Sequence, residues 1–148
     1  MTENAPRELV VPPLARAGLE PDTIAPDGSE IRLLVGEQHR ISRVSVCEVT
    51  LPAGAASRPV AHRTVEEVWY VLDGHGDVWR EAPGPNATRT RPVSVKPGDA
   101  LTIPQRWRFQ FRASTAGPLR FLCVTAPPWP GSDEAEPIVG EGCWQPTV

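Results

Sequence analysis

Short apolar stretches that alternate with polar residues dominate the middle of the chain. Between positions 67 and 72, Glu67, Trp69 and Val71 fall on one face of an extended strand, and the other three residues fall on the opposite face. Such alternation is typical of a strand with one buried side. Comparable stretches predict further strands at residues 30–35, 40–51, 77–81, 92–96, 100–103, 107–112 and 119–125.

Glycine and proline separate these stretches. The chain has 12 Gly and 18 Pro among its 148 residues, which is too many for a helical bundle. This composition suits short strands joined by tight turns, as in a sandwich or a small barrel. The length suits one domain, and 40% apolar residues give that domain a core of modest size. We therefore expect a single all-β domain.

Proline also divides the chain into three parts. Residues 1–25 form an arm with one apolar cluster, Leu9-Val10-Val11, and this arm is either a loose tail or an addition to a sheet edge. Residues 26–126 carry the predicted strands and form the barrel. Residues 127–148 are too rich in proline for a central strand, and we expect Trp129 and Trp144 in this tail to cover an end of the barrel.

Charge and composition exclude several classes of function. The net charge is -3, the pI is near 5.6 and no run of Lys or Arg forms a stripe, which argues against nucleic acid or an anionic membrane as a partner. No segment has the roughly 18 apolar residues of a spanning helix, and the N-terminus lacks a signal pattern, so a cytoplasmic location is expected. Cys47, Cys123 and Cys143 are an odd number at unrelated spacings, which favours free thiols over a disulfide framework.

The stretch from Gly54 to Gly74 carries the candidate chemistry. Its pattern predicts a hairpin, with a strand, a polar turn that contains His62, Glu66 and Glu67, and a second strand that starts at residue 68. An imidazole and a carboxylate at the joint between two strands are able to converge on one pocket, where they hold a metal or move a proton. The alternative is that both are solvated turn residues.

The same stretch resembles the first motif of the cupin superfamily. That motif reads Gly, five residues, His-x-His, three or four residues, Glu, six residues, Gly. Here Gly54, His62, Glu67 and Gly74 fit every spacing, but Val60 stands where the first metal-binding histidine would be. The resemblance implies a small, single-domain bacterial cupin with a double-stranded β-helix, or jelly-roll, barrel.

The second cupin motif is only partly matched. It reads Gly, five residues, Pro-x-Gly, two residues, His, three residues, Asn. Gly98 and Pro104 match, whereas Arg106 replaces the second glycine, Phe109 the histidine and Ala113 the asparagine. Of the three His and one Glu with which cupins usually hold a metal, two ligands remain, and two ligands bind first-row metals too weakly to stay loaded. We therefore expect no metal cofactor; the alternative is Fe, Mn, Ni or Zn at His62 and Glu67, completed by Glu66, Cys47 or water.

The residues that replace the ligands predict an apolar pocket. With Phe109 at the histidine position, strand alternation sends Trp107 and Phe111 to the same side, where they join Trp69 and Val60 as candidate substrate-binding residues.

A one-residue slip of this strand predicts a different pocket. Arg108, Gln110 and Arg112 would then point inward, and the guanidinium groups would hold a carboxylate or phosphate. The aromatic register is favoured because charges seldom point into a barrel without a partner.

A dry aromatic pocket around His62 and Glu67 suits general acid-base catalysis. The sequence therefore predicts an isomerase, cyclase or lyase-type enzyme that carries out an isomerisation, cyclisation, dehydration or Pictet-Spengler type condensation on a small, partly aromatic metabolite. By analogy with metal-poor cupins of GC-rich bacteria, the pathway is one of natural-product biosynthesis. The alternatives are a metal-dependent cupin dioxygenase or isomerase and a non-catalytic module that binds a small ligand. Open sheet edges and the N-terminal arm favour a homodimer.

Overall fold

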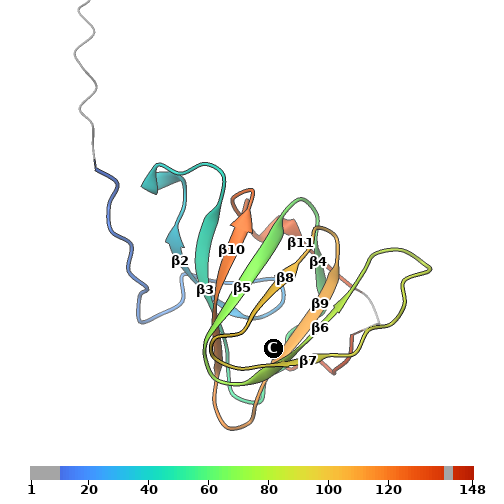
Figure 1. Cartoon of the computed structure of the whole chain (residues 1–148). Coiled ribbons are helices and arrows are strands. Elements are labelled where there is room, and N and C mark those ends of the chain that lie inside the picture. The colour runs from blue at the N-terminus through green and yellow to red at the C-terminus, as the bar shows by residue number, and fades with distance from the viewer. Residues whose placement is uncertain (1–10, 139–141) are drawn as a thin grey trace, which may run out of the picture.

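Two antiparallel β-sheets face each other in the computed structural model, which describes residues 11–138 and 142–148 (Figure 1). The six-stranded sheet has the order β1-β2-β3-β10-β5-β8, and the five-stranded sheet has the order β11-β4-β9-β6-β7. This is the predicted all-β jelly-roll barrel. The elements are β1 (Thr23–Ile24), β2 (Glu30–Val35), η1 (Glu37–His39), β3 (Ser45–Leu51), β4 (Val60–His62), β5 (Glu66–Asp73), β6 (Gly76–Glu81), β7 (Val93–Val95), β8 (Ala100–Ile103), β9 (Arg108–Ala113), β10 (Leu119–Ala126), η2 (Ser132–Glu134) and β11 (Ala135–Pro137), where η marks a 3-10 helix.

The core lies between the sheets and follows the predicted alternation. In β5, Trp69 is 3% exposed, whereas Val68 and Tyr70 on the outer face are 47% and 48% exposed. The Trp69 ring stacks on Phe121 from β10 at 4.2 Å and meets the edge of Phe111 from β9 at 5.1 Å. Aromatic pairs, one within the six-stranded sheet and one between the two sheets, therefore fill the middle of the barrel.

The hairpin predicted between Gly54 and Gly74 is wrong. β4 pairs with β9 and β11, whereas β5 pairs with β10 and β8, so the two strands belong to opposite sheets. The three residues between them cross from one sheet to the other instead of closing a ladder. His62 and Glu67 consequently lie within strands, and not in a turn.

Two other predicted boundaries differ from the structure. The strand predicted at 40–51 begins at Ser45, because η1 precedes it and Arg40 has a left-handed φ of 62°. The N-terminal arm contributes β1, which pairs with β2 at the edge of the six-stranded sheet. Leu9 and Val10 of the predicted apolar cluster lie outside the described residues.

The end of the chain packs on the outer face of the five-stranded sheet. The Gln110 side chain donates to the carbonyl oxygens of Ser57 at 2.8 Å and Trp144 at 2.7 Å, and it accepts a bond from the Trp144 amide at 3.0 Å. The Arg112 guanidinium lies 4.6 Å from the centre of the Trp144 ring. None of the helices among the described residues has the length and apolar character needed to cross a membrane.

Candidate functional site

His62 and Glu67 meet inside the barrel, one from each sheet. β4 brings His62 from the five-stranded sheet, and β5 brings Glu67 from the six-stranded sheet. The distance from His62 Nε2 to Glu67 Oε1 is 3.2 Å, and the two side chains are each 8% exposed. The short crossing between the strands places an imidazole and a carboxylate in direct contact, out of bulk water.

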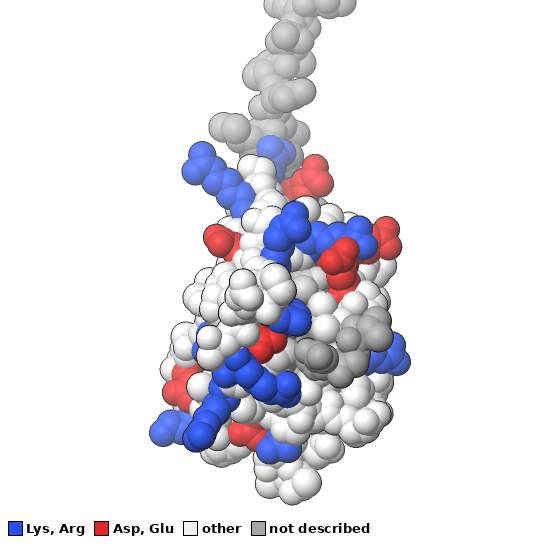
Figure 2. Space-filling view, turned by 90° about the vertical axis from the view of Figure 1, so that its right-hand side faces the viewer, with Lys and Arg blue, Asp and Glu red and all other residues white. Residues whose placement is uncertain are grey.

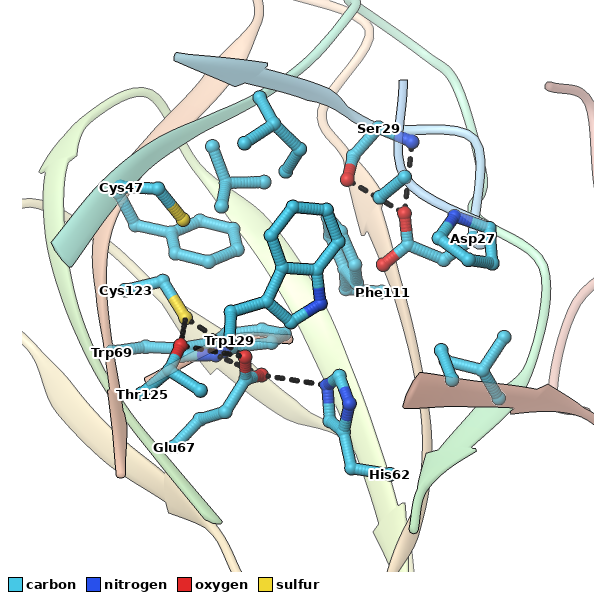
Figure 3. A pocket seen from close by; sticks show the side chains of 17 residues that line it. Asp27, Ser29, Cys47, His62, Glu67, Trp69, Phe111, Cys123, Thr125 and Trp129 are labelled. Carbon is cyan, nitrogen blue, oxygen red and sulfur yellow. Dashed lines mark hydrogen bonds and ion pairs between the residues drawn. The ribbon is translucent and has the colours of Figure 1, made fainter. Parts of the chain in front are cut away.

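Glu67 accepts hydrogen bonds on both carboxylate oxygens (Figure 3). Trp69 Nε1 donates to Oε1 at 3.1 Å, beside His62. Cys123 Sγ donates to Oε2 at 3.0 Å, and Thr125 Oγ1 donates to the same oxygen at 3.4 Å. Four donors around one buried carboxylate favour its ionised form.

The pKa values of the pair move in the directions expected for an ion pair. Burial alone would raise the pKa of Glu67, but the hydrogen bond and charge of His62, with the bonds from Cys123 and Trp69, hold it below its usual range. Burial would lower the pKa of His62, and the Glu67 carboxylate raises it instead. The bond with Cys47, burial and the Glu67 charge raise the pKa of the Cys123 thiol, which therefore stays protonated.

One nitrogen of His62 has an unused lone pair. Because Nε2 faces the ionised Glu67, we assign the proton of the neutral ring to Nε2 and the lone pair to Nδ1. Nδ1 is buried and receives no hydrogen bond from any described residue. The ring stacks on Phe109 with centroids 5.4 Å apart, which fixes its orientation. His62 is therefore able to accept a proton while Glu67 stabilises the cation.

The pair borders a cavity of about 50 Å³, which has room for a few water molecules. Trp129, from the segment after β10, lies among the polar groups of the cavity, and its amide donates to Ser45 Oγ at 2.9 Å (Figure 3). The cavity is too small for an aromatic ring, so an aromatic ligand requires a lining side chain such as Trp129 to move. The apolar wall is formed by Ile31, Val49, Val60, Trp69, Phe111 and Phe121, and the polar groups are Asp27, Ser29, His62, Glu67, Cys123 and Thr125.

The structure brings most of the predicted aromatic wall together. Trp69, Phe111 and Val60 line the cavity, and Phe109 lies behind His62. Trp107 does not join them, because it lies in the turn before β9 and borders a separate hollow beside Val78 and other residues. The alternation that places Phe109 and Phe111 starts only at the first residue of β9.

Arg108 and Gln110 lie on the outer face of β9. Arg108 pairs there with Glu81 at 2.8 Å, and Arg112 pairs with Asp77 at 2.9 Å. Gln110 is buried because the end of the chain covers it, and not because it points into the barrel. Figure 2, which views the molecule from the side of the five-stranded sheet, shows basic and acidic side chains intermixed. The alternative register is therefore not the one observed.

Four residues of the cavity were not predicted as site residues from the sequence, although Trp129 was expected to cover an end of the barrel. Asp27 reaches it from the turn before β2, Cys123 and Thr125 from β10, and Trp129 from the tail. The alternation of β10 would have placed Cys123 and Thr125 on the inner face with Phe121. Local sequence gave no signal for Asp27, which looks like an ordinary Asp-Gly turn residue.

The donor set does not fit the metal that the cupin motifs imply. Val60 and Phe109, each 1% exposed, occupy two of the four motif positions. His62 and Glu67 bond to each other, and within residues 11–138 and 142–148 no three His, Cys, Asp or Glu side chains are arranged to hold a metal ion. The residues present thus do not form a first-row divalent metal site with Fe, Mn, Ni or Zn at His62 and Glu67.

A family model and a curated relative match this chain. The family model for the cupin domain matches residues 47–125. An uncharacterized protein of Methanocaldococcus jannaschii is 30% identical over 111 residues, which covers 74% of this chain and 82% of that protein.

Solved structures share the fold at low identity. The polyketide cyclase RemF of Streptomyces resistomycificus has a TM-score of 0.62 and 22% identity, with 86% of this chain and 82% of that chain covered. Pac13, described as a unique nucleoside dehydratase, has a TM-score of 0.57 and 14% identity, with 84% of each chain covered. At these identities the likeness shows the barrel and not the reaction.

Proposed function

This chain belongs to the cupin family, and we propose that it is an enzyme that moves protons on a small, partly aromatic metabolite without a metal. The observation that carries the proposal is the buried contact of 3.2 Å between His62 and Glu67 beside an aromatic cavity. Glu67 holds the ring and stabilises its cation, and His62 supplies the basic nitrogen. General acid-base catalysis needs such a pair, with a base whose pKa lies near neutral pH.

The aromatic residues in the cavity wall favour a planar substrate. Trp69 and Phe111 present aromatic surface beside the pair, and a flat ring stacks on or packs against such groups. Trp129 has to leave the cavity before a ring enters, and its departure leaves space of about the size of an indole. After binding, the ligand takes the place of Trp129 in keeping water from the pair.

Two structurally similar proteins favour reactions of this class. One is named a polyketide cyclase and the other a nucleoside dehydratase. Ring closure and loss of water both require a proton to leave carbon and another to reach oxygen. We infer an isomerisation, cyclisation, dehydration or Pictet-Spengler type condensation, and a role in natural-product biosynthesis.

Exchange of carbon-bound hydrogen tests this function without the natural substrate. The protein is incubated in D₂O with a planar aromatic ketone, 1-tetralone, and the loss of the α-C–H signal is followed by NMR. We expect the wild type to accelerate the exchange and both His62→Ala and Glu67→Gln to slow it by about 10²-fold or more. Asp77→Asn, on the outer face of β6, is the matched control and should equal the wild type.

Equal exchange rates for the wild type and both variants would overturn the proposal. The folded state of each variant is checked by circular dichroism before the comparison.

A further inference from the structure

Asp27 is a second buried carboxyl in the same cavity. Its side chain lies in the turn between β1 and β2 and is 8% exposed. The amide and the hydroxyl of Ser29 both donate to Oδ1, at 2.9 Å and 2.6 Å. No described residue donates to Oδ2, and Figure 3 shows this oxygen directed toward the cavity that His62 and Glu67 border. One oxygen of Asp27 is thus fixed by the protein, and the other is free for a ligand.

Segments that are distant in sequence hold the turn in place. The amide of Arg58 donates to the Asp27 carbonyl at 2.8 Å, and Ala25 donates to the Ser29 carbonyl at 2.9 Å. Gly28 has φ of 93°, and a Cβ there would collide with a methyl group of Val148. A carboxyl held by this packing keeps its direction when a ligand arrives.

The pKa values of the two cavity carboxyls, Asp27 and Glu67, are shifted in opposite directions. Burial raises the pKa of Asp27, the Glu67 charge adds to that rise, and the Ser29 bonds and His62 oppose it. His62, Cys123 and Trp69 instead lower the pKa of Glu67. Among the described residues that line the cavity, the other titratable groups are the Cys47 and Cys123 thiols. Two carboxyls whose environments push their pKa values apart are suited to opposite roles, one as acid and one as base or its support.

We propose that Asp27 is the acid of this site, and that its Oδ2–H donates a hydrogen bond and then a proton to a carbonyl or hydroxyl oxygen of the substrate. This inference rests on the proposed function, in which the His62–Glu67 pair takes a proton from carbon. The substrate class is accordingly a carbon acid with an oxygen function beside the acidic C–H bond, such as a ketone or a β-hydroxy carbonyl compound.

Both reactions of this class balance without an added reactant. In enolisation the pair removes the α-proton, the C–H electrons form a C=C bond, and the carbonyl oxygen takes the proton of Asp27 to become a hydroxyl. Where the enol is conjugated with a second C=C bond, His62 returns the proton to a second carbon, the hydroxyl proton goes back to Asp27, and the C=O bond re-forms, which completes an isomerisation. In dehydration, the Asp27 proton leaves with the hydroxyl group as water, and the proton on His62 returns to Asp27 through solvent.

Binding of two ligands with the same shape tests the role of Asp27. Acetophenone has a carbonyl oxygen where α-methylstyrene has a methylene group, and the affinity of each is measured by NMR titration. We expect the wild type to prefer the ketone by about tenfold, the value of one net hydrogen bond in a buried site. Asp27→Asn should keep part of the preference through its amide, Asp27→Leu should lose it, and the outer-face control Asp77→Asn should keep all of it.

The outcomes separate this inference from the proposed function. An unchanged ketone preference in Asp27→Leu would overturn the inference, and so would a failure of acetophenone to bind both the wild type and Trp129→Ala, whose cavity is larger. His62→Ala should lose deuterium exchange and keep the ketone preference. A preference that depends on Asp27, without exchange in the wild type, would remove the proposed function and leave Asp27 as a ligand-binding group.

A measurement on the unaltered protein guards against a variant that does not fold. The ¹³C signal of the Asp27 carboxyl is followed from acid to neutral pH in the wild type. We expect its pKa to lie above the ordinary value of an aspartate carboxyl and the signal to shift when acetophenone is added. A titration like that of a free aspartate, with no response to acetophenone, would also overturn the inference.

Discussion

Glu67 and Asp27 border one cavity, but their carboxyl groups have different hydrogen-bond partners and opposite pKa shifts. Glu67 receives hydrogen bonds from an imidazole, an indole, a thiol and a hydroxyl, and the first three of these donors lower its pKa despite burial. Asp27 receives two bonds on a single oxygen from one residue, Ser29, and burial raises its pKa. The state of a buried carboxyl therefore depends on how many donors reach both oxygens and on whether one of them is charged.

Of the substitutions that separate the two carboxyls, removal of Glu67 should change the free energy of unfolding most. Glu67→Ala leaves His62 without its partner and three further donors without an acceptor. We expect a loss of about 3–5 kcal/mol in the free energy of unfolding, measured with urea, because one member of a buried ion pair is left alone. Glu67→Gln, which keeps the shape, should lose less; equal losses would show that the missing charge and not the missing packing is responsible.

The pH dependence of stability tests the charges of the pair. Glu67 has its pKa lowered from 4.5, so its contribution is present above that pH and is lost as the pH falls through the folded-state value. His62 has its pKa raised from 6.5, so its contribution is present below that pH and is lost as the pH rises through the folded-state value. We expect the pair to contribute fully between pH 4.5 and 6.5.

Thermal unfolding across pH 3–9 measures this window. The comparison is made in the Asp27→Asn background, because the pKa of Asp27 is also shifted and its titration would overlap the contributions of the pair. In the double variant His62→Gln, Glu67→Gln, both the decrease in stability on the acid side and the decrease on the alkaline side of this window should disappear. A profile that keeps its shape in the double variant would assign the pH dependence to other groups.

Asp27→Asn should stabilise the protein, in contrast to Glu67→Ala, which should destabilise it. Because the pKa of Asp27 is raised from 3.8, its contribution is complete below that pH and declines as the pH rises through the folded-state value, where a charge must be buried. The neutral amide avoids that charge and still accepts both Ser29 bonds. We expect a gain of about 1–2 kcal/mol in unfolding free energy at high pH and none at pH 3. A destabilised variant at high pH would show that Asp27 is ionised and satisfied.

Thr125→Val should have the smallest effect. This substitution keeps the shape and removes the longest of the four hydrogen bonds to Glu67, at 3.4 Å. We expect a loss of about 0.5–1 kcal/mol in unfolding free energy and little change in the deuterium exchange rate, since three donors remain. A loss comparable to that of Glu67→Ala would mean that the donors act as one cooperative unit.

The inner and outer faces of β9 show which side-chain positions the sequence alternation predicted and which it did not. Alternation placed Phe109 and Phe111 on the inner face, and Arg108 outside, where Glu81 pairs with it. It did not place Gln110, which is fully buried on the outer face because residues near Trp144 cover it. A two-residue period reports which side a residue takes, and only the packing of distant segments decides whether that side is covered.

The sequence by itself determined most of the strand pattern and the spacing that puts His62 and Glu67 five residues apart. These features follow from backbone geometry and side-chain polarity over a few neighbouring residues. The tertiary structure alone decided that β4 and β5 join opposite sheets, so that the pair meets across the barrel and not in a turn.

Tertiary structure also added Asp27 and Trp129 to the cavity and left Trp107 outside it. The physical reason is that sheet pairing and cavity shape depend on contacts between residues far apart in the chain. Such contacts leave no mark on the local pattern of polar and apolar positions.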